Sequence, residues 1–260
     1  MKKLIIVLLL GAFVAGCETI LDMIDEPTAS ASIKNAYVIT VGVENGYAGK
    51  CAGAKKDCNN MKSLLKKYAQ KQVSLIDKQA TITAVCNALK EGVQTPLCIF
   101  YFSGHGGSIP TAQAAHDTTE VDKNDEFICL YDGGLLDNSI WNIISKAKGR
   151  VVLLFDCCHS GTMYRATPIN FSKQLRKLSA TNKISGNVSI LCWSGCPDDS
   201  YSYGSNSGGK FTNTLRNKYS KNKTYNDVWN KIESDKTLKK YEKVQRTIIG
   251  TDFGDRKIFQ

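Results

Sequence analysis

The sequence has no Cys-x-x-Cys pair among its ten cysteines. Structural zinc sites and thiol redox motifs use such short spacings, so we expect neither metal binding nor redox exchange by paired cysteines. Cys98, Cys129 and Cys192 stand inside apolar runs, and we expect their thiols to be buried as small hydrophobic groups. The cysteines are scattered and do not have the pattern of a small disulfide-rich domain. The sequence leaves a disulfide somewhere in the chain as an alternative.

The sequence also lacks an apolar run long enough to cross a bilayer. Its N-terminal run extends from Leu4 to Val14, whereas a spanning helix needs about 20 apolar residues. The run ends in small residues before Cys17, which resembles a bacterial lipobox, so we predict a lipoprotein signal over residues 1–17 with lipidation at Cys17. An ordinary signal peptide is the alternative. A flexible tether over 18–32 would then carry an exported, membrane-anchored domain on the periplasmic or cell-surface side.

Clustered basic residues are missing, although the formal net charge is +10. Lysines are spread along helix-like segments, which is typical of a solvated surface and does not favour nucleic-acid binding. No internal repeat is visible, and 260 residues with 42% hydrophobic content suffice for one large domain with a sizeable core.

Apolar strands alternate with amphipathic helices along residues 33–260. Continuous apolar strands separated by such helices predict a mainly parallel sheet covered on both faces, and therefore one α/β domain. The predicted strands lie near residues 36–43, 72–76, 97–102, 151–155, 187–193 and 245–250, and the predicted helices near 54–70, 81–93, 136–147, 210–219 and 225–234.

Two of these strands end in chemically distinctive residues. One is followed by Ser103-Gly-His105-Gly-Gly, and the other by Asp156-Cys157-Cys158-His-Ser-Gly. Chemistry in parallel sheets gathers at the carboxyl ends of strands, and the glycines are expected to let the backbone turn sharply there. A histidine and a cysteine on neighbouring strand ends suit a thiol nucleophile with a general acid/base.

These motifs resemble those of the caspase and metacaspase family, most closely the bacterial metacaspases. "YFSGHGG" is similar to the family's histidine motif, and "FDCCHSG" is similar to its cysteine motif. Fifty-three positions separate His105 from Cys158, close to the spacing of about 50 residues in caspases. Further similarity in "KKDCNNMKSLL", "LCWSGCPDDSYSY" and "GGKFTNTL" extends the resemblance over nearly all of residues 33–260.

The resemblance implies a caspase-like fold, with a mainly parallel six-stranded sheet between helices on both faces. It also implies that Cys158 is the nucleophile, that His105 is the acid/base, and that the N–H groups of Gly106 and Cys158 form an oxyanion hole. Strand alternation should point Cys157 away from the cleft. His159 is adjacent to the nucleophile and His116 lies in a polar stretch, so neither is expected to act. No third catalytic residue is evident.

The resemblance further implies cleavage of peptides after Arg or Lys, through a pocket formed by Asp57, Ser103 and Asp156. Paired carboxylates match a guanidinium or ammonium group in charge and in hydrogen bonding. Simpler interpretations are an exposed helix-start residue for Asp57 and a strand-end cap for Asp156. Ala54 stands where the family often has cysteine, so the rim of the pocket differs.

Two departures from the family pattern concern calcium and processing. Arg165 replaces an expected calcium-binding acid, and only Asp137 stands in the matching acidic loop, so we expect no metal or other cofactor. Residues 164–183 form a basic segment in which the protein could cleave itself. Metacaspase relatives tend to be monomers, and we expect the same here.

Two other functions remain as alternatives. One is a non-catalytic lipoprotein that keeps the fold for binding, which predicts a damaged Cys–His pair. The other is a thiol redox protein that uses Cys157 and Cys158. A disulfide between these adjacent cysteines would form a strained ring.

Overall fold

The computed structural model describes residues 34–110, 124–158, 188–195 and 205–260. Several predicted features lie outside these residues. They are the signal and Cys17, the tether over 18–32, His116, His159, Arg165 and the segment 164–183. Internal contacts group Ser32–Gln260 as one unit, to which all the described residues belong.

A single large sheet organises this unit. Its strands are β1 (Ala36–Gly42), β4 (Ala69–Ile76), β5 (Leu97–Pro110), β6 (Asn124–Cys129), β7 (Gly134–Leu136), β8 (Arg150–Cys158), β9 (Ser189–Ser194) and β10 (Gln245–Gly250). The main path runs β10-β9-β8-β5-β1-β4, with β6 paired to the far end of β5 and β7 paired to β6. All pairs on the main path are parallel except β9 with β10. A separate hairpin joins β2 (Asn45–Gly46) and β3 (Gly49–Lys50).

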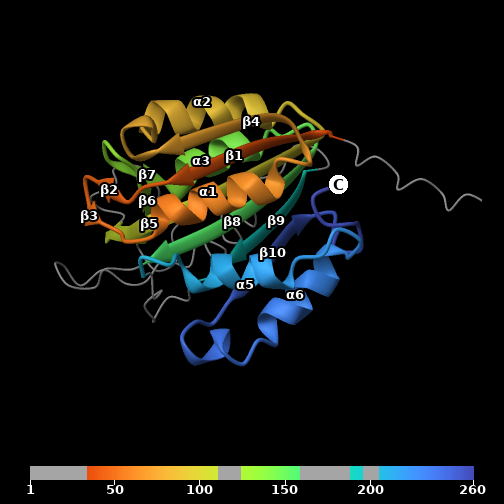
Figure 1. Cartoon of the computed structure of the whole chain (residues 1–260). Coiled ribbons are helices and arrows are strands. Elements are labelled where there is room, and N and C mark those ends of the chain that lie inside the picture. The colour runs from red at the N-terminus through yellow and green to blue at the C-terminus, as the bar shows by residue number, and fades with distance from the viewer. Residues whose placement is uncertain (1–33, 111–123, 159–187, 196–204) are drawn as a thin grey trace, which may run out of the picture. The chain divides into compact units, whose positions relative to one another are not determined.

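Helices cover both faces of this sheet (Figure 1). They are α1 (Ala54–Leu65), α2 (Ile82–Gly92), α3 (Asp137–Ile144), α5 (Lys210–Lys218) and α6 (Tyr225–Glu233), with short 3-10 turns η1 (Asp77–Gln79) and η2 (Leu238–Lys240). Apolar residues of α2 and α3 belong to one core cluster, and those of α1, α5 and α6 belong to another. The predicted α/β sandwich with a mainly parallel central sheet is therefore confirmed.

Strand alternation divides the apolar side chains between the two cores. In β1, Tyr37, Ile39 and Val41 belong to the core under α2 and α3, whereas Ala36 and Val38 belong to the core under α1. Both sets are buried, which is why the strand reads as continuously apolar in the sequence.

The first predicted helix is shorter than expected. The helix ends at Leu65, and the chain turns where the Tyr68 N–H donates to the Leu65 carbonyl. The Tyr68 carbonyl then accepts from Ala36, so that Ala69 already belongs to β4. Burial of Tyr68 in the core overrides the helical pattern that continues through this stretch.

The glycines after Phe102 do not form the expected sharp turn. β5 continues through Ser103–Gly107 to Pro110, and β6, which the periodicity did not predict, pairs with this extension. A Cβ atom at Gly104 would overlap the Phe102 ring, and one at Gly107 would overlap the Phe127 ring. These glycines therefore permit close packing against aromatic rings in extended backbone.

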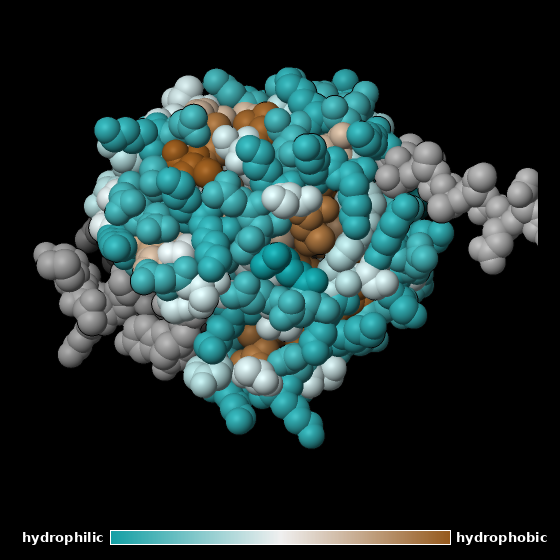
Figure 2. Space-filling model, viewed as in Figure 1, coloured by the Kyte–Doolittle hydropathy of each residue, from teal (hydrophilic) through white to brown (hydrophobic). Residues whose placement is uncertain are grey.

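The visible face of the unit is mostly hydrophilic, with apolar surface limited to small separate patches (Figure 2). Among the described side chains, Tyr47 and Tyr241 are the large hydrophobic residues that are exposed. No helix in the described part of the chain is long and apolar enough to cross a membrane.

Trp193 gives a test of the second core. Its indole is fully buried, with ring centroids 5.4 Å from Trp229 and 6.0 Å from Tyr225. Trp193→Ala should lower the free energy of unfolding by about 3–5 kcal/mol, measured by urea denaturation. Trp193→Phe should cost clearly less, because the buried indole N–H has no hydrogen-bond partner among the described residues. Equal losses for the two variants would contradict this account.

Candidate active site

The pairing of β5 with β8 brings the two sequence motifs together. The strands are parallel neighbours, and their register places Ser103 beside Asp156 and His105 beside Cys158. Both motifs therefore lie side by side where the pairing of β5 with β8 ends, although β5 itself continues to Pro110. Cys158 is the last residue of β8. The structure describes its backbone and leaves its side chain undescribed.

His105 has a hydrogen bond that the sequence did not predict. Its Nε2 atom lies 3.0 Å from the backbone carbonyl of Lys50, at the end of the β2–β3 hairpin. A carbonyl only accepts hydrogen bonds, so Nε2 carries a proton, and in the neutral ring Nδ1 is then an unprotonated acceptor. Nδ1 is buried and has no hydrogen-bond partner among the described residues. The ring is thus ready to accept a proton at Nδ1.

Cys157 belongs to the packed core. Its side chain is 4% exposed and joins the apolar cluster that contains Phe102 and Phe155. The buried position matches the expectation that Cys157 faces the sheet packing. Gly106 follows His105 in β5 and pairs with Ile128 of β6, so its backbone is held at the sheet end next to the histidine.

Three buried polar side chains lie close together near this end of the sheet, namely Asp57, Ser103 and Asp156. All three side chains are at most 3% exposed. The Ser103 hydroxyl donates to Asp57 Oδ2 at 3.2 Å, and the Gly209 N–H donates to the same oxygen at 2.8 Å. Asp57 is therefore not the exposed helix-start residue of the simpler interpretation. Its second oxygen, Oδ1, is buried without a hydrogen-bond partner among the described residues.

Asp156 connects the sheet to α5. Its Oδ2 atom accepts from the Thr212 N–H at 2.9 Å and from the Thr212 hydroxyl at 2.5 Å. The Tyr101 hydroxyl lies 2.5 Å from the same Thr212 hydroxyl. The carboxylate is thus more than a strand-end cap, because it fixes the first turn of α5, whose helix dipole favours negative charge at this end.

Gly208 and Gly209 allow α5 to approach both carboxylates. A Cβ atom at Gly208 would overlap Asp57 Oδ1, and one at Gly209 would overlap Asp156 Oδ2. Gly208 also has a φ of 98°, a conformation that favours glycine. Where Gly208 and Gly209 approach the two carboxylates, the contact is therefore made by backbone atoms.

Burial and mutual repulsion perturb the acidic pair. Burial, the largest cause, and the negative charge of Asp156 together raise the pKa of Asp57 to about 7. The hydrogen bonds from Gly209 and Ser103 oppose this shift but do not cancel it. One proton is therefore held by the pair on the acid side of neutrality, and a cation nearby would favour its release.

Residues suited to a metal ion do not gather in the described part of the chain, where no cluster of three His, Cys, Asp or Glu side chains has ligand geometry. Asp137 is fully buried as the first residue of α3 and accepts from the Asn138 N–H at 2.8 Å. Asp137 therefore stands at the start of the helix predicted over residues 136–147.

The predicted burial of Cys98, Cys129 and Cys192 is confirmed. Their side chains are at most 4% exposed, and burial raises the pKa of Cys98 and of Cys129 to about 12. These thiols stay protonated at neutral pH, and a protonated thiol is a poor nucleophile.

Comparison with known proteins bears on these residues. The caspase domain, defined as a sequence family, matches residues 34–249. Metacaspase-1 of Cryptococcus neoformans is 30% identical over 138 residues, which cover 45% of this chain and 29% of that protein. Metacaspase-1 of Yarrowia lipolytica is 34% identical over 101 residues, covering 36% of this chain and 21% of that protein. The chain thus spans less than a third of the length of either fungal protein.

A solved structure shares the fold. The crystal structure of a protein from Geobacter sulfurreducens superposes with a TM-score of 0.67 at 23% identity, covering 87% of this chain and 98% of that chain. At this identity, the similarity supports the fold alone.

The acidic pair predicts an unusual pH dependence of stability. Because the folded-state pKa of Asp57 lies above its ordinary value, its stabilising contribution is complete at acid pH and is lost as pH rises through about 7. Asp57→Asn should therefore stabilise the fold more at pH 8 than at pH 5, by about 2–3 kcal/mol, because part of the loss already occurs below pH 5. Urea denaturation of both proteins at each pH measures the difference, and an equal effect at the two values would contradict it.

Proposed function

The chain belongs to the family of caspase domains, and on this premise we propose that it is a cysteine endopeptidase of metacaspase type that cleaves after Arg or Lys. The observation that carries the proposal is the register of β5 and β8, which sets His105 beside Cys158 at the last pair of these two adjacent strands. A protein or peptide is the substrate that this family membership favours.

Cys158 is the nucleophile in this proposal. Its thiol proton passes to Nδ1 of His105, and the resulting thiolate attacks the scissile carbonyl. As the acyl-enzyme forms, His105 gives that proton to the departing amine. His105 then takes a proton from water, whose oxygen attacks the acyl carbon and displaces the Cys158 thiolate, and the proton returns from His105 to the thiolate. The N–H groups of Gly106 and Cys158 stabilise the oxyanion. The Lys50 carbonyl supports this role, because it orients the ring and leaves Nδ1 as the basic nitrogen.

Asp57, Ser103 and Asp156 form the specificity pocket in this proposal. Two buried carboxylates, one with an oxygen that lacks a partner among the described residues, favour a cationic side chain. A guanidinium group would donate to the spare oxygen and release the proton held by the pair. A substrate carboxylate in the same place would add a further negative charge, so cleavage after Asp is disfavoured.

The attachment proposed for the domain is a lipid on Cys17. It would hold an exported, monomeric peptidase at a membrane through the tether over residues 18–32. This part of the proposal rests on the lipobox resemblance in the sequence.

A panel of fluorogenic peptides tests the proposed activity. Peptides that end in Arg or Lys should be cleaved and their Asp counterpart should not, with and without a calcium chelator. Cys158→Ala should abolish cleavage, while Cys157→Ala, a matched control one residue away, should keep most of it. Failure of the processed protein to cleave any peptide would sink the proposal and favour the non-catalytic binding lipoprotein. Loss of activity in both variants would instead point to a joint role of the two thiols.

Self-processing is a separate consequence of basic specificity. Residues 164–183 contain Arg165, Arg176, Lys177 and Lys183, and each is a cleavage site for an enzyme of this specificity. Wild-type protein should show fragments on a denaturing gel, and Cys158→Ala should stay intact. The same fragments in both samples would rule self-cleavage out and indicate a contaminating protease.

A further inference from the structure

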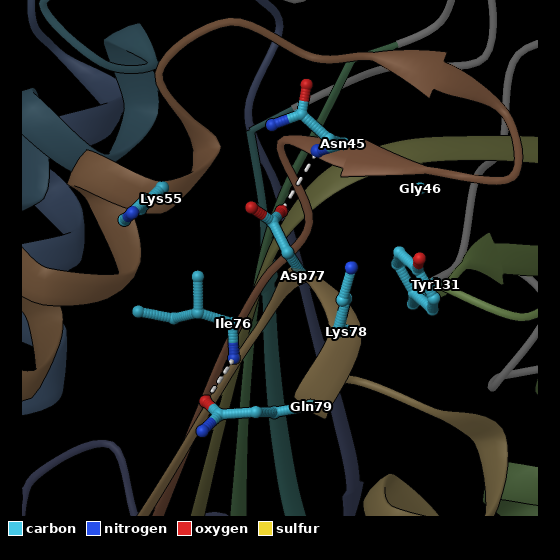
Figure 3. Close-up of a pocket in the computed structure, with 8 residues that line it drawn as sticks. All are labelled: Asn45, Gly46, Lys55, Ile76, Asp77, Lys78, Gln79 and Tyr131. Atoms are coloured by element: carbon cyan, nitrogen blue, oxygen red, sulfur yellow. Dashed lines mark hydrogen bonds between the residues drawn. The ribbon is translucent and has the colours of Figure 1, made fainter.

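Asp77 ties two distant parts of the chain together at the edge of the sheet. It follows β4 and begins η1, with a φ of 46° in the left-handed region, which aspartate and asparagine enter more readily than most residues other than glycine. Its Oδ1 atom accepts from the Glu44 N–H at 2.8 Å and from the Asn45 N–H at 2.9 Å. Figure 3 shows the carboxylate pointing at the start of the β2 strand.

The strand held by Asp77 is the partner of the strand that contacts the candidate acid/base. In the β2–β3 hairpin, Asn45 pairs with Lys50. The hairpin is closed by a hydrogen bond of 2.7 Å from the Cys51 N–H to the Glu44 carbonyl. The Lys50 carbonyl then lies 3.0 Å from His105 Nε2. A continuous path of hydrogen bonds and strand pairing thus runs from Asp77 to the imidazole.

The position of this hairpin depends on its contacts with the rest of the domain. Each strand has two residues, and a hairpin of that size is not stable alone in water. Lys50 is itself exposed, so its carbonyl is not fixed by burial of its side chain. Val43, just before the hairpin, donates its N–H to the Ser103 carbonyl at 3.0 Å. The Asp77 carboxylate adds a tie at the start of the hairpin from another part of the chain.

We propose that Asp77 is a positioning residue for His105: its carboxylate holds the hairpin so that the Lys50 carbonyl fixes the orientation and tautomer of the imidazole. This inference rests on the proposed role of His105 in peptide cleavage. Asp77 does not touch the reacting atoms, so its effect on the rate passes entirely through the hairpin.

The setting of Asp77 makes the proposal testable without disrupting a core. Asp77 lines an open groove of about 750 Å³ together with Asn45, Lys55, Lys78 and Tyr131 (Figure 3). The carboxylate is half-buried, and Lys55 and Lys78 are the cationic residues of the same groove. Replacing it therefore removes the tie and leaves both apolar core clusters intact.

Two substitutions separate the carboxylate from the backbone conformation. Asp77→Gly tolerates the positive φ and deletes the acceptor, whereas Asp77→Asn tolerates the same φ and keeps an acceptor oxygen. Asp132→Gly is the matched control, because Asp132 Oδ1 accepts from the Ile82 N–H at 2.9 Å at the start of a helix that the hairpin path does not include. Should Asp77→Gly fail to fold, Asp77→Ser provides the test, because its shorter hydroxyl does not span the distance to both N–H groups.

Nitrogen-15 NMR of labelled histidine, in the Cys158→Ala background, reads the tautomer of His105 directly, with His105→Ala used for assignment. Wild type, Asp77→Asn and Asp132→Gly should all show the proton on Nε2, and Asp77→Gly should show a mixture. In the active background, Asp77→Gly should lower kcat by about 10- to 100-fold with little change in KM, as expected when a catalytic group is misplaced.

The two readouts distinguish the possible failures. An unchanged tautomer and kcat in Asp77→Gly would overturn the positioning role, and so would a wild-type His105 that is not protonated on Nε2. Equal losses in Asp77→Gly and Asp132→Gly would reduce the role to general stability and also overturn it. The last possible outcome is that Asp77→Gly changes the tautomer of His105 while the wild-type protein cleaves no peptide. The positioning role would then stand, and the proposed peptidase function would fail.

Discussion

The in-register pairing of β5 with β8 is the constraint on which the site depends. It sets two residue pairs at once, Ser103 with Asp156 and His105 with Cys158. Side chains alternate between the two faces of a strand, so a slip of one residue would send each of these residues to the opposite face. Apolar residues earlier in the same strands prevent such a slip, because Phe100 and Phe155 fill one core while Tyr101 and Leu154 fill the other. The register that buries the core is therefore also the register that assembles the site.

The acidic pair has a structural as well as a chemical consequence. Asp57 and Asp156 together accept four hydrogen bonds from Ser103, Gly209 and Thr212. These bonds hold the start of α5 against the sheet, but they do not remove the cost of keeping two negative charges close together in a buried place. Such a pair destabilises the folded protein at neutral pH and is compensated when a cation binds. The same repulsion that raises the pKa of Asp57 favours a basic ligand.

Much of this arrangement could be predicted from the sequence, and the reasons for the misses are physical. Continuous apolar strands and amphipathic helices identified the sandwich, and the motifs around His105 and Cys158 identified the strand ends. The Lys50 carbonyl could not be predicted, because a backbone acceptor is present at every residue and leaves no pattern in the sequence. The end of the first helix at Leu65 was missed because burial of Tyr68 overrides helical periodicity. The extension of β5 beyond Phe102 was missed because its glycines pack against aromatic rings instead of forming a turn.

The choice of a carbonyl to orient His105 agrees with the charge of its surroundings. A carboxylate in that place would also fix the ring, and it would stabilise the imidazolium more strongly. It would, however, add a third negative charge near the buried pair Asp57 and Asp156, and would raise the cost of keeping that pair ionised. The neutral Lys50 carbonyl orients the ring through one hydrogen bond and adds no charge. The negative charge of the site is thereby kept in the pocket that would bind a basic side chain, and the orientation of the histidine depends on how firmly a short hairpin is held.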